Sequence, residues 1–188
     1  MLREEVLKSV QILNGGGIIL YPTDTIWGLG CDAYNKKAVE RLFKIKERMA
    51  DKSVIVLIDS LCLVKENILT LFKEGDSLLQ NSIKPQTVIF PKVTGFPLGV
   101  LNLNGSMAFR IPKHKFCQEL LKEFKRPLVS TSANISGEKT PLYFDEISDK
   151  IKHQVDYVVS ESVEGEMTHQ PSRIVLLEND GTSSLIRP

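Results

Sequence analysis

The sequence predicts an α/β protein with a mixed, twisted sheet and helices packed against it. Segments with apolar residues at helical spacing alternate with short apolar runs that are typical of buried strands. The last three strand-like runs have little helix between them, so a mixed sheet fits better than a strictly parallel one. The chain has 188 residues and no internal repeat or linker-like stretch, and we therefore expect a single domain over 1–188.

The first half of the chain is expected to alternate between helix and strand. An N-terminal helix ends at three consecutive glycines, which supply its C-cap and the following turn. The apolar run 18–21 is typical of a buried strand, closed by Pro22. A second helix is expected over 36–48, a buried strand over 53–58, and a helical stretch over 60–82 that breaks near Gly75.

The second half continues this alternation until its last third. One helix is expected over 113–125. The expected strands are 87–91, 107–111, 127–130, 155–160, 174–177 and 184–186.

Cysteine usage and hydropathy bear on the compartment. Cys31, Cys62 and Cys117 lie far apart and are odd in number, which argues against a disulfide framework and a zinc site. No apolar run approaches the roughly 18 residues that a membrane span needs, and the charged N-terminus does not resemble a secretory signal. We therefore expect a cytoplasmic protein without a membrane partner.

Charge is unevenly distributed along the chain. Residues 36–52 hold seven bases against three acids, whereas 145–166 hold seven acids against two bases. The positive stretch suits an anionic ligand. Two solvated helix faces of opposite sign explain the same pattern equally well.

The first polar stretch, 21–33, follows a predicted strand. Thr23 and Thr25 supply hydroxyls, and Gly28 and Gly30 allow close approach of the backbone to a ligand. G-L-G-C-D-A formally matches a dinucleotide-binding fingerprint, but that motif begins directly after its strand and opens a helix. Here six residues intervene, so a plain loop is the stronger of these two interpretations.

The second polar stretch, 44–52, ends a predicted helix. Lys46 and Arg48 can converge on one anion only if the helix frays after about residue 47, because positions two apart point in different directions. Such a pair suits phosphates. A cationic helix end that complements the helix dipole is the alternative.

The third polar stretch, 130–137, follows another predicted strand. Ser130, Thr131, Ser132 and Asn134 are more hydroxyl and amide groups than a helix cap needs, which favours a bound ligand. The sequence contains no nucleophile elbow or P-loop, and its three histidines are isolated.

Taken together and in this order, these stretches resemble the YrdC/TsaC family, the L-threonylcarbamoyladenylate synthases. The resemblance runs from about residue 10 to 188. Its matching segments are YPTDTIWGLGCDA, the K-x-R of Lys46 and Arg48 with Lys52 beyond it, AFRIP around Arg110, STSANISG, and the tail P-S-R-I-V with L-I-R-P.

The resemblance implies a fold and a reaction. The fold is a mixed twisted open sheet with flanking helices around a large cavity, of the YrdC/RibB-like type. The reaction joins L-threonine, bicarbonate or CO₂, and ATP, with Mg²⁺, into threonylcarbamoyl-AMP and pyrophosphate. The product feeds the t6A modification at position 37 of tRNA through downstream transfer proteins, and tRNA or double-stranded RNA is a further possible partner.

The resemblance also implies roles for individual residues. Lys46 and Arg48 would be catalytic and, with Lys52, would face the ATP phosphates. The residues expected to complete the nucleotide site are Ser106, Arg110, Ser132, Asn134 and Arg187. Those expected near threonine are Thr23, Ser130 and Ser172.

Three positions depart from the family pattern. The P-G-P-x-T stretch is replaced by Lys84-Pro85-Gln86-Thr87, Ser53 stands in place of a proline, and Arg173 stands where threonine is common. The chain is expected to be of the short type, without the extra C-terminal domain of longer relatives. The alternatives are a non-catalytic RNA-binding module of this fold and a carbamoyl-adenylate enzyme of the hydrogenase-maturation type, which normally forms part of a much larger chain.

Overall fold

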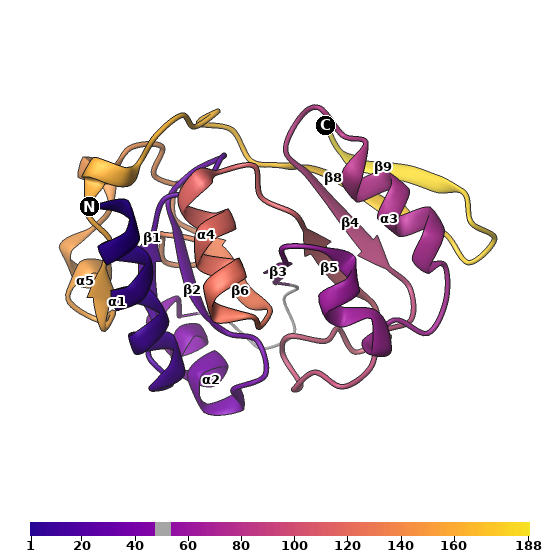
Figure 1. Cartoon of the computed structure of the whole chain (residues 1–188), viewed down its shortest axis with the longest axis horizontal. Helices are drawn as coiled ribbons and strands as arrows, with labels where there is room; N and C mark the ends of the chain where they lie inside the picture. Colours follow the sequence, from indigo (N-terminus) through magenta and orange to yellow (C-terminus); the bar gives the residue numbers. More distant parts are fainter. Residues whose placement is uncertain (48–53) are drawn as a thin grey trace.

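A computed structural model of the chain describes residues 1–47 and 54–188, and its strands form one mixed sheet (Figure 1). The strands are β1 (Ile19–Tyr21), β2 (Gly28–Asp32), β3 (Ile55–Leu57), β4 (Gln86–Phe90), β5 (Met107–Arg110), β6 (Leu128–Ser132), β7 (Tyr157–Val158), β8 (Arg173–Leu177) and β9 (Ser183–Arg187). Their order is β7-β1-β2-β6-β3-β5-β4-β8-β9. The pairs β1–β7, β3–β5 and β4–β8 are parallel and the other five are antiparallel, which confirms the predicted mixed sheet.

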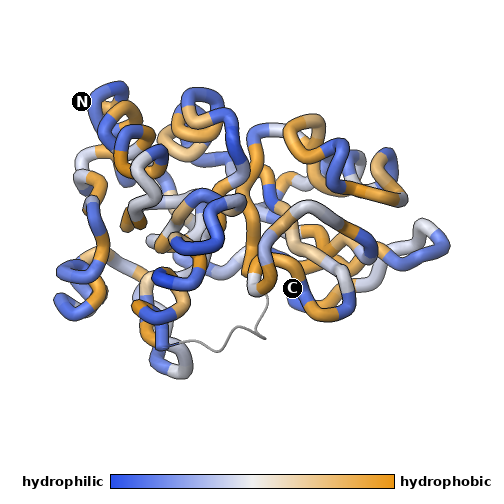
Figure 2. The backbone as a smooth tube through the Cα atoms, turned by 90° about the horizontal axis from the view of Figure 1, so that it is seen from below, coloured by the Kyte–Doolittle hydropathy of each residue, from blue (hydrophilic) through white to orange (hydrophobic). Residues whose placement is uncertain are grey.

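Helices cover both faces of this sheet. They are α1 (Leu2–Asn14), α2 (Lys36–Ile45), α3 (Phe72–Gln80), α4 (Lys115–Phe124) and α5 (Asp149–Lys152), with 3₁₀ turns η1 (Leu61–Asn67), η2 (Phe144–Glu146) and η3 (Glu161–Val163). α1 and α4 lie side by side on one face (Figure 1). Hydrophobic stretches gather in the central strands, whereas the helices alternate between hydrophobic and hydrophilic residues (Figure 2), as amphipathic helices on a sheet should.

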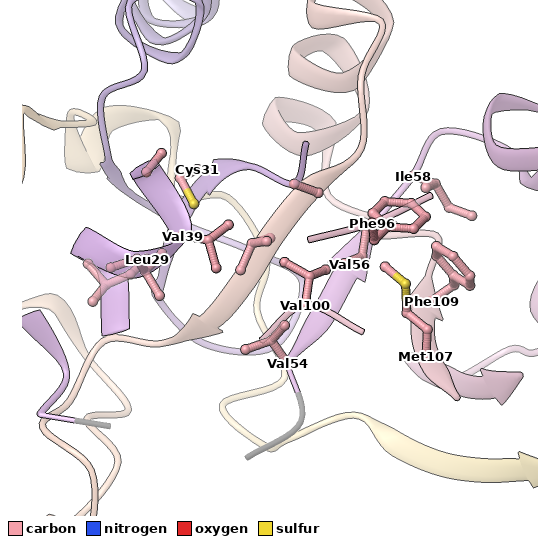
Figure 3. Close-up of a cluster of buried hydrophobic side chains, with 14 of the residues drawn as sticks. Leu29, Cys31, Val39, Val54, Val56, Ile58, Phe96, Val100, Met107 and Phe109 are labelled. Atoms are coloured by element: carbon pink, nitrogen blue, oxygen red, sulfur yellow. The ribbon is translucent and has the colours of Figure 1, made fainter. Parts of the chain in front are cut away.

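The two faces have separate apolar cores because neighbouring residues in a strand point to opposite sides. On β3, Leu57 packs under α1 and α4, whereas Val56 packs with α2 and the opposite layer. Figure 3 shows this second layer, in which Leu29 of β2, Val56 of β3 and Phe109 of β5 are among the side chains that gather beside α2.

One face changes from apolar to polar along the strands. Leu128 of β6 packs under α1 and α4, and Ser130 and Ser132 follow on the same face. On adjacent strands, Ser130 of β6 is paired with Ile55 of β3, and Arg110 of β5 is paired with Thr87 of β4. The part of this face that α1 and α4 leave uncovered therefore carries hydroxyls and a guanidinium.

Four expectations about the elements were wrong. Residues 28–32 form the buried strand β2 instead of a loop, so no helix opens after the second glycine and the dinucleotide interpretation is excluded. Thr131 and Ser132, expected in the loop after the strand 127–130, belong to β6. α2 ends at Ile45, and Glu47 has a left-handed backbone with φ 49°. The break in 60–82 falls at 68–71, because Leu71 adopts a left-handed conformation there.

Gly75 lies inside α3, where its missing side chain serves packing and does not break the helix. A Cβ at this position would lie 2.1 Å from Cζ of Phe90, a fully buried ring on β4. Glycine therefore allows α3 to approach the sheet closely.

We predict that Gly75→Ala lowers the free energy of unfolding by about 1–3 kcal/mol, because the buried ring cannot move aside cheaply. Helix propensity alone predicts the opposite sign, a gain of about 1 kcal/mol. Urea denaturation measures the change, with the exposed position Lys73→Ala as a control. A Phe90→Leu background should remove most of the loss, and a more stable Gly75→Ala protein would refute the packing argument.

Candidate active site

A cavity of about 290 Å³ opens over the polar part of this face. It is bordered by the loop 22–27 and by residues of β2, β3, β4, β5, β6 and β8. Its size lies near the lower end of the range for small-molecule sites, roughly 300–1,000 Å³. Six of the predicted site residues line it: Thr23, Arg110, Ser130, Ser132, Ser172 and Arg187.

Thr23 organises the loop that forms one wall. Its hydroxyl donates to the Ile26 carbonyl at 2.7 Å and accepts from the Thr25 amide at 3.1 Å. Because its proton is used in this way, the 2.9 Å contact with Thr25 has the Thr25 hydroxyl as donor. The loop is therefore held rigid by its own hydroxyls.

Arg110 is buried at the end of β5 and forms an ion pair with Asp24 of the same loop. The guanidinium also donates to the Thr25 hydroxyl at 3.1 Å, and the second carboxylate oxygen of Asp24 accepts from the Lys113 amide at 3.0 Å. Nε of Arg110 is buried and has no hydrogen-bond partner among the described residues. Such unsatisfied buried donors are uncommon in native structures.

Arg187 brings a second guanidinium to the cavity from β9. Its Nε and Nη2 donate to the Ser172 carbonyl at 3.0 and 2.6 Å, and the Ser172 hydroxyl lies 2.8 Å from that of Thr87. Partial burial and the positive charge of Arg110 lower the pKa of Arg187. Two arginines in one cavity favour an anionic ligand, which would relieve their mutual repulsion.

Lys46 is buried at the end of α2 and holds the loop after β6. Its ammonium donates to the carbonyls of Ser132 and Asn134 at 2.5 and 2.7 Å. The Ser132 hydroxyl donates to Oδ1 of Asn134 at 2.5 Å. The structure thus joins three predicted nucleotide residues in one network, in which Ser132 lines the cavity while Lys46 and Asn134 support it.

Three predicted residues remain: Ser106, Arg48 and Lys52. Ser106 precedes β5 at the end opposite Arg110, outside the cavity lining, and its hydroxyl donates to Asn104 at 2.7 Å. Arg48 and Lys52 lie outside the described residues, so their expected phosphate contacts stay predictions.

Four residues of this site were not predicted with a role, although Thr25 was singled out for its hydroxyl. Thr25 and Thr87 line the cavity, Trp27 borders it with a fully buried side chain, and Asp24 pairs with Arg110. Asp24 stands between the two threonines of the first polar stretch, and an acid at that place could have indicated a partner for a buried base. Thr87 could not have been recognised as a site residue in this way, because threonine is common in strands.

The oppositely charged stretches meet on the surface. Arg41 of α2 forms an ion pair with Asp156 at 2.5 Å, and Lys150 of α5 pairs with Glu47. Partial burial acts to raise the pKa of Asp156. Hydrogen bonds from Arg41 and from the Ile18 amide outweigh this effect, so the pKa is lowered. Part of the positive charge of α2 is therefore neutralised within the chain itself.

Carboxylates are absent from the part of the cavity lining that the structure describes. The described residues likewise contain no group of three or more His, Cys, Asp or Glu side chains placed to hold a metal. The polar side chains of the described lining are hydroxyls and two guanidiniums, and they lie beside apolar residues such as Ile55, Ile89 and Ile174.

These features define the class of protein: an α/β protein whose mixed sheet presents a cationic, hydroxyl-lined cavity suited to a phosphate- or carboxylate-bearing ligand. A family model named Sua5/YciO/YrdC and described as telomere recombination matches residues 11–188. The chain belongs to the Sua5/YciO/YrdC family.

Individual relatives agree with this assignment. A threonylcarbamoyl-AMP synthase of Pseudoalteromonas translucida is 35% identical over 175 residues, which cover 90% of this chain and 91% of the relative. The structure of P. abyssi Sua5 complexed with L-threonine superposes with a TM-score of 0.85 at 26% identity, over 100% of this chain and 54% of Sua5. E. coli YciO gives a TM-score of 0.81 at 26% identity, over 100% of this chain and 89% of YciO. The chain thus spans about half the length of that Sua5.

The helices among residues 1–47 and 54–188 include none that is long and apolar enough to cross a bilayer.

We predict that Asp24→Ala lowers the free energy of unfolding by about 3–5 kcal/mol, because it leaves the buried Arg110 charge unpaired. Asp24→Asn should cost less, since its amide oxygen still accepts hydrogen bonds. The control is Glu123→Ala, which breaks the exposed pair with Arg3 and should cost at most about 1 kcal/mol. Equal urea midpoints for Asp24→Ala and the control would contradict the assigned role of the pair.

Proposed function

We propose that the protein is a threonylcarbamoyl-AMP synthase, an enzyme that makes threonylcarbamoyl-AMP and pyrophosphate from L-threonine, bicarbonate or CO₂, and ATP. The single observation that carries the proposal is the match over 90% of the chain to a relative of that name. The cavity supports it chemically, because its guanidiniums and hydroxyls suit a carboxylate and phosphates.

The reaction needs positioning and charge stabilisation more than a nucleophilic side chain. The amine of threonine attacks CO₂, or bicarbonate with loss of water, to give a carbamate. A carbamate oxygen then attacks the α-phosphorus of ATP, and pyrophosphate leaves. Arg110 and Arg187 would neutralise carboxylate or phosphate charge, and the hydroxyls of Ser130 and Ser172 would orient threonine through hydrogen bonds.

Lys46 would act through the loop that it holds. Its ammonium fixes the Ser132 and Asn134 carbonyls, so the hydroxyl of Ser132 is presented to the cavity in one orientation. The same positive charge lies next to this polar wall, where it would favour the phosphates of ATP.

Mg²⁺ would enter as the complex with ATP. A magnesium ion usually keeps several waters and is bound by one or two carboxylates together with substrate phosphates. The described lining offers hydroxyls for such a complex, so we propose that the phosphates themselves carry the ion.

The non-catalytic RNA-binding alternative is weakened by one surface ion pair. Asp156 partly neutralises Arg41 of α2, which leaves less free positive charge for a polyanion. Direct RNA contact, transfer of the product to proteins that modify tRNA, and a cytoplasmic location remain predictions.

We predict that the protein releases pyrophosphate from ATP, Mg²⁺ and bicarbonate only when L-threonine is added. A coupled pyrophosphatase assay measures the release, and mass spectrometry identifies the adenylate. L-Serine and L-valine serve as matched amino acids, each of which lacks one substituent of the threonine side chain. Turnover without threonine, or none with it, would rule out the synthase.

We also predict that Lys46→Ala lowers kcat/KM for ATP by about a hundredfold or more, because loop position and positive charge are lost together. Lys44→Ala, which removes the same charge from an exposed position of α2, is the matched control. Arg48→Ala should act in the same direction as Lys46→Ala. Normal ATP kinetics in both Lys46→Ala and Arg48→Ala would show that the phosphates bind elsewhere.

A further inference from the structure

Thr87 is a fully buried residue of β4 on the cavity side of the sheet. It is paired with Arg110 of β5 on one side and with Ile174 of β8 on the other, and both of these residues line the cavity. The next residue, Val88, belongs to the apolar layer on the opposite face. The side chain of Thr87 therefore lies beneath the cavity, between the strand that carries Arg110 and the strand that follows Ser172.

The hydroxyl of Thr87 serves one partner. Its Oγ1 lies 2.8 Å from Oγ of Ser172, a buried residue that lines the cavity. Neither hydroxyl has a second hydrogen-bond partner within residues 1–47 and 54–188. Valine has nearly the shape of threonine and is equally at home in strands, so packing alone does not require a hydroxyl here. The bond to Ser172 therefore explains why this position carries a hydroxyl.

The backbone of Ser172 is held by other contacts. Its carbonyl accepts from Nε and Nη2 of Arg187 at 3.0 and 2.6 Å. The amide of the next residue, Arg173, donates to the Pro85 carbonyl at 2.9 Å. What these contacts leave free is rotation about the Cα–Cβ bond of Ser172, which directs its hydroxyl. The contact with Thr87 fixes this direction.

The bond to Thr87 leaves the hydroxyl of Ser172 able to bind a ligand. A serine hydroxyl has one proton and two lone pairs, and the contact with Thr87 uses only one of these. The guanidiniums of Arg110 and Arg187 line the same cavity, where their positive charge favours an anionic group. A fixed hydroxyl near two guanidiniums suits the carboxylate of an amino acid.

We propose that Thr87 is a positioning residue for the amino-acid subsite: its hydroxyl holds that of Ser172 in the orientation that hydrogen-bonds to L-threonine. The proposal rests on the proposed function for its substrate, but the coupling of the two hydroxyls does not. Thr87 does not touch the substrate, and its effect passes through Ser172.

Substitutions at Thr87 separate this role from packing. Thr87→Val keeps the shape and removes the hydroxyl, so it should raise KM for threonine about tenfold, equivalent to about 1.4 kcal/mol, while kcat and KM for ATP stay within about twofold. Thr87→Ser keeps the hydroxyl and should leave KM for threonine within about twofold of wild type, although loss of the buried methyl lowers the urea midpoint. The matched control is Val88→Ala on the other face of β4, which should lower the urea midpoint without changing either KM.

A double-mutant cycle tests the path through Ser172. Ser172→Ala should itself raise KM for threonine, and adding Thr87→Val to it should raise KM no further. Additive effects of the two changes, or a Thr87→Ser protein that loses as much affinity as Thr87→Val, would overturn the proposal. An equal rise in KM for ATP and threonine would also overturn it, because that is the signature of a general structural role.

Urea denaturation without substrate keeps this proposal separate from the enzymatic one. Thr87→Val leaves the buried Ser172 hydroxyl unpaired, so Ser172→Ala should lower the urea midpoint less in the Thr87→Val background than in wild type. Equal shifts in both backgrounds would show that the hydroxyls are not coupled and would overturn the proposal. If the wild-type protein shows no threonine-dependent turnover, the proposed function fails while this coupling can still be measured. If turnover is normal and Thr87→Val keeps the wild-type KM for threonine, the positioning role alone fails.

Discussion

The buried ion pair between Arg110 and Asp24 is the interaction on which the rest of the site depends. Burying a guanidinium is costly unless a charged partner and hydrogen bonds compensate it. Asp24 supplies that partner and also bonds to two other segments. Its second carboxylate oxygen accepts from the Lys113 amide, and its backbone carbonyl accepts from the Thr168 amide. One pair thereby fastens the loop 22–27, the start of α4 and the segment 159–172 to the end of β5.

The cavity exists because helices cover only part of one sheet face. Under α1 and α4 the strands present Leu57 and Leu128. On the same face Ser130 follows Leu128 along β6, whereas Arg110 of β5 and Thr87 of β4 lie beside Leu57 across the sheet. A sheet can make this change within a few residues, because every second side chain shares a face. The polar groups therefore stand on rigid strands, which gives them more precise positions than loops would.

The sequence predicted much of the site but assigned several residues the wrong kind of support. Thr131, Ser132 and the glycines of 28–30 were expected in loops, because clusters of small polar residues and glycine between apolar runs are typical of loops. In the fold they lie in β6 and β2, where Gly30 makes room for the ring of Tyr21, whose Cε1 would lie 2.7 Å from a Cβ. Packing overrode propensity, and short-range patterns do not record such packing.

The sequence by itself determined the alternation of helix and strand, the mixed sheet and most of the polar groups that line the cavity. These follow from periodicity and motif order, which are local properties of the chain. Only the tertiary structure decided which groups are partners: Arg110 with Asp24, Arg187 with the Ser172 carbonyl, Lys46 with the loop after β6 and Trp27 with Glu164. These contacts join residues between 15 and 137 positions apart, and the strand order that brings them together is set by burial of the whole sheet.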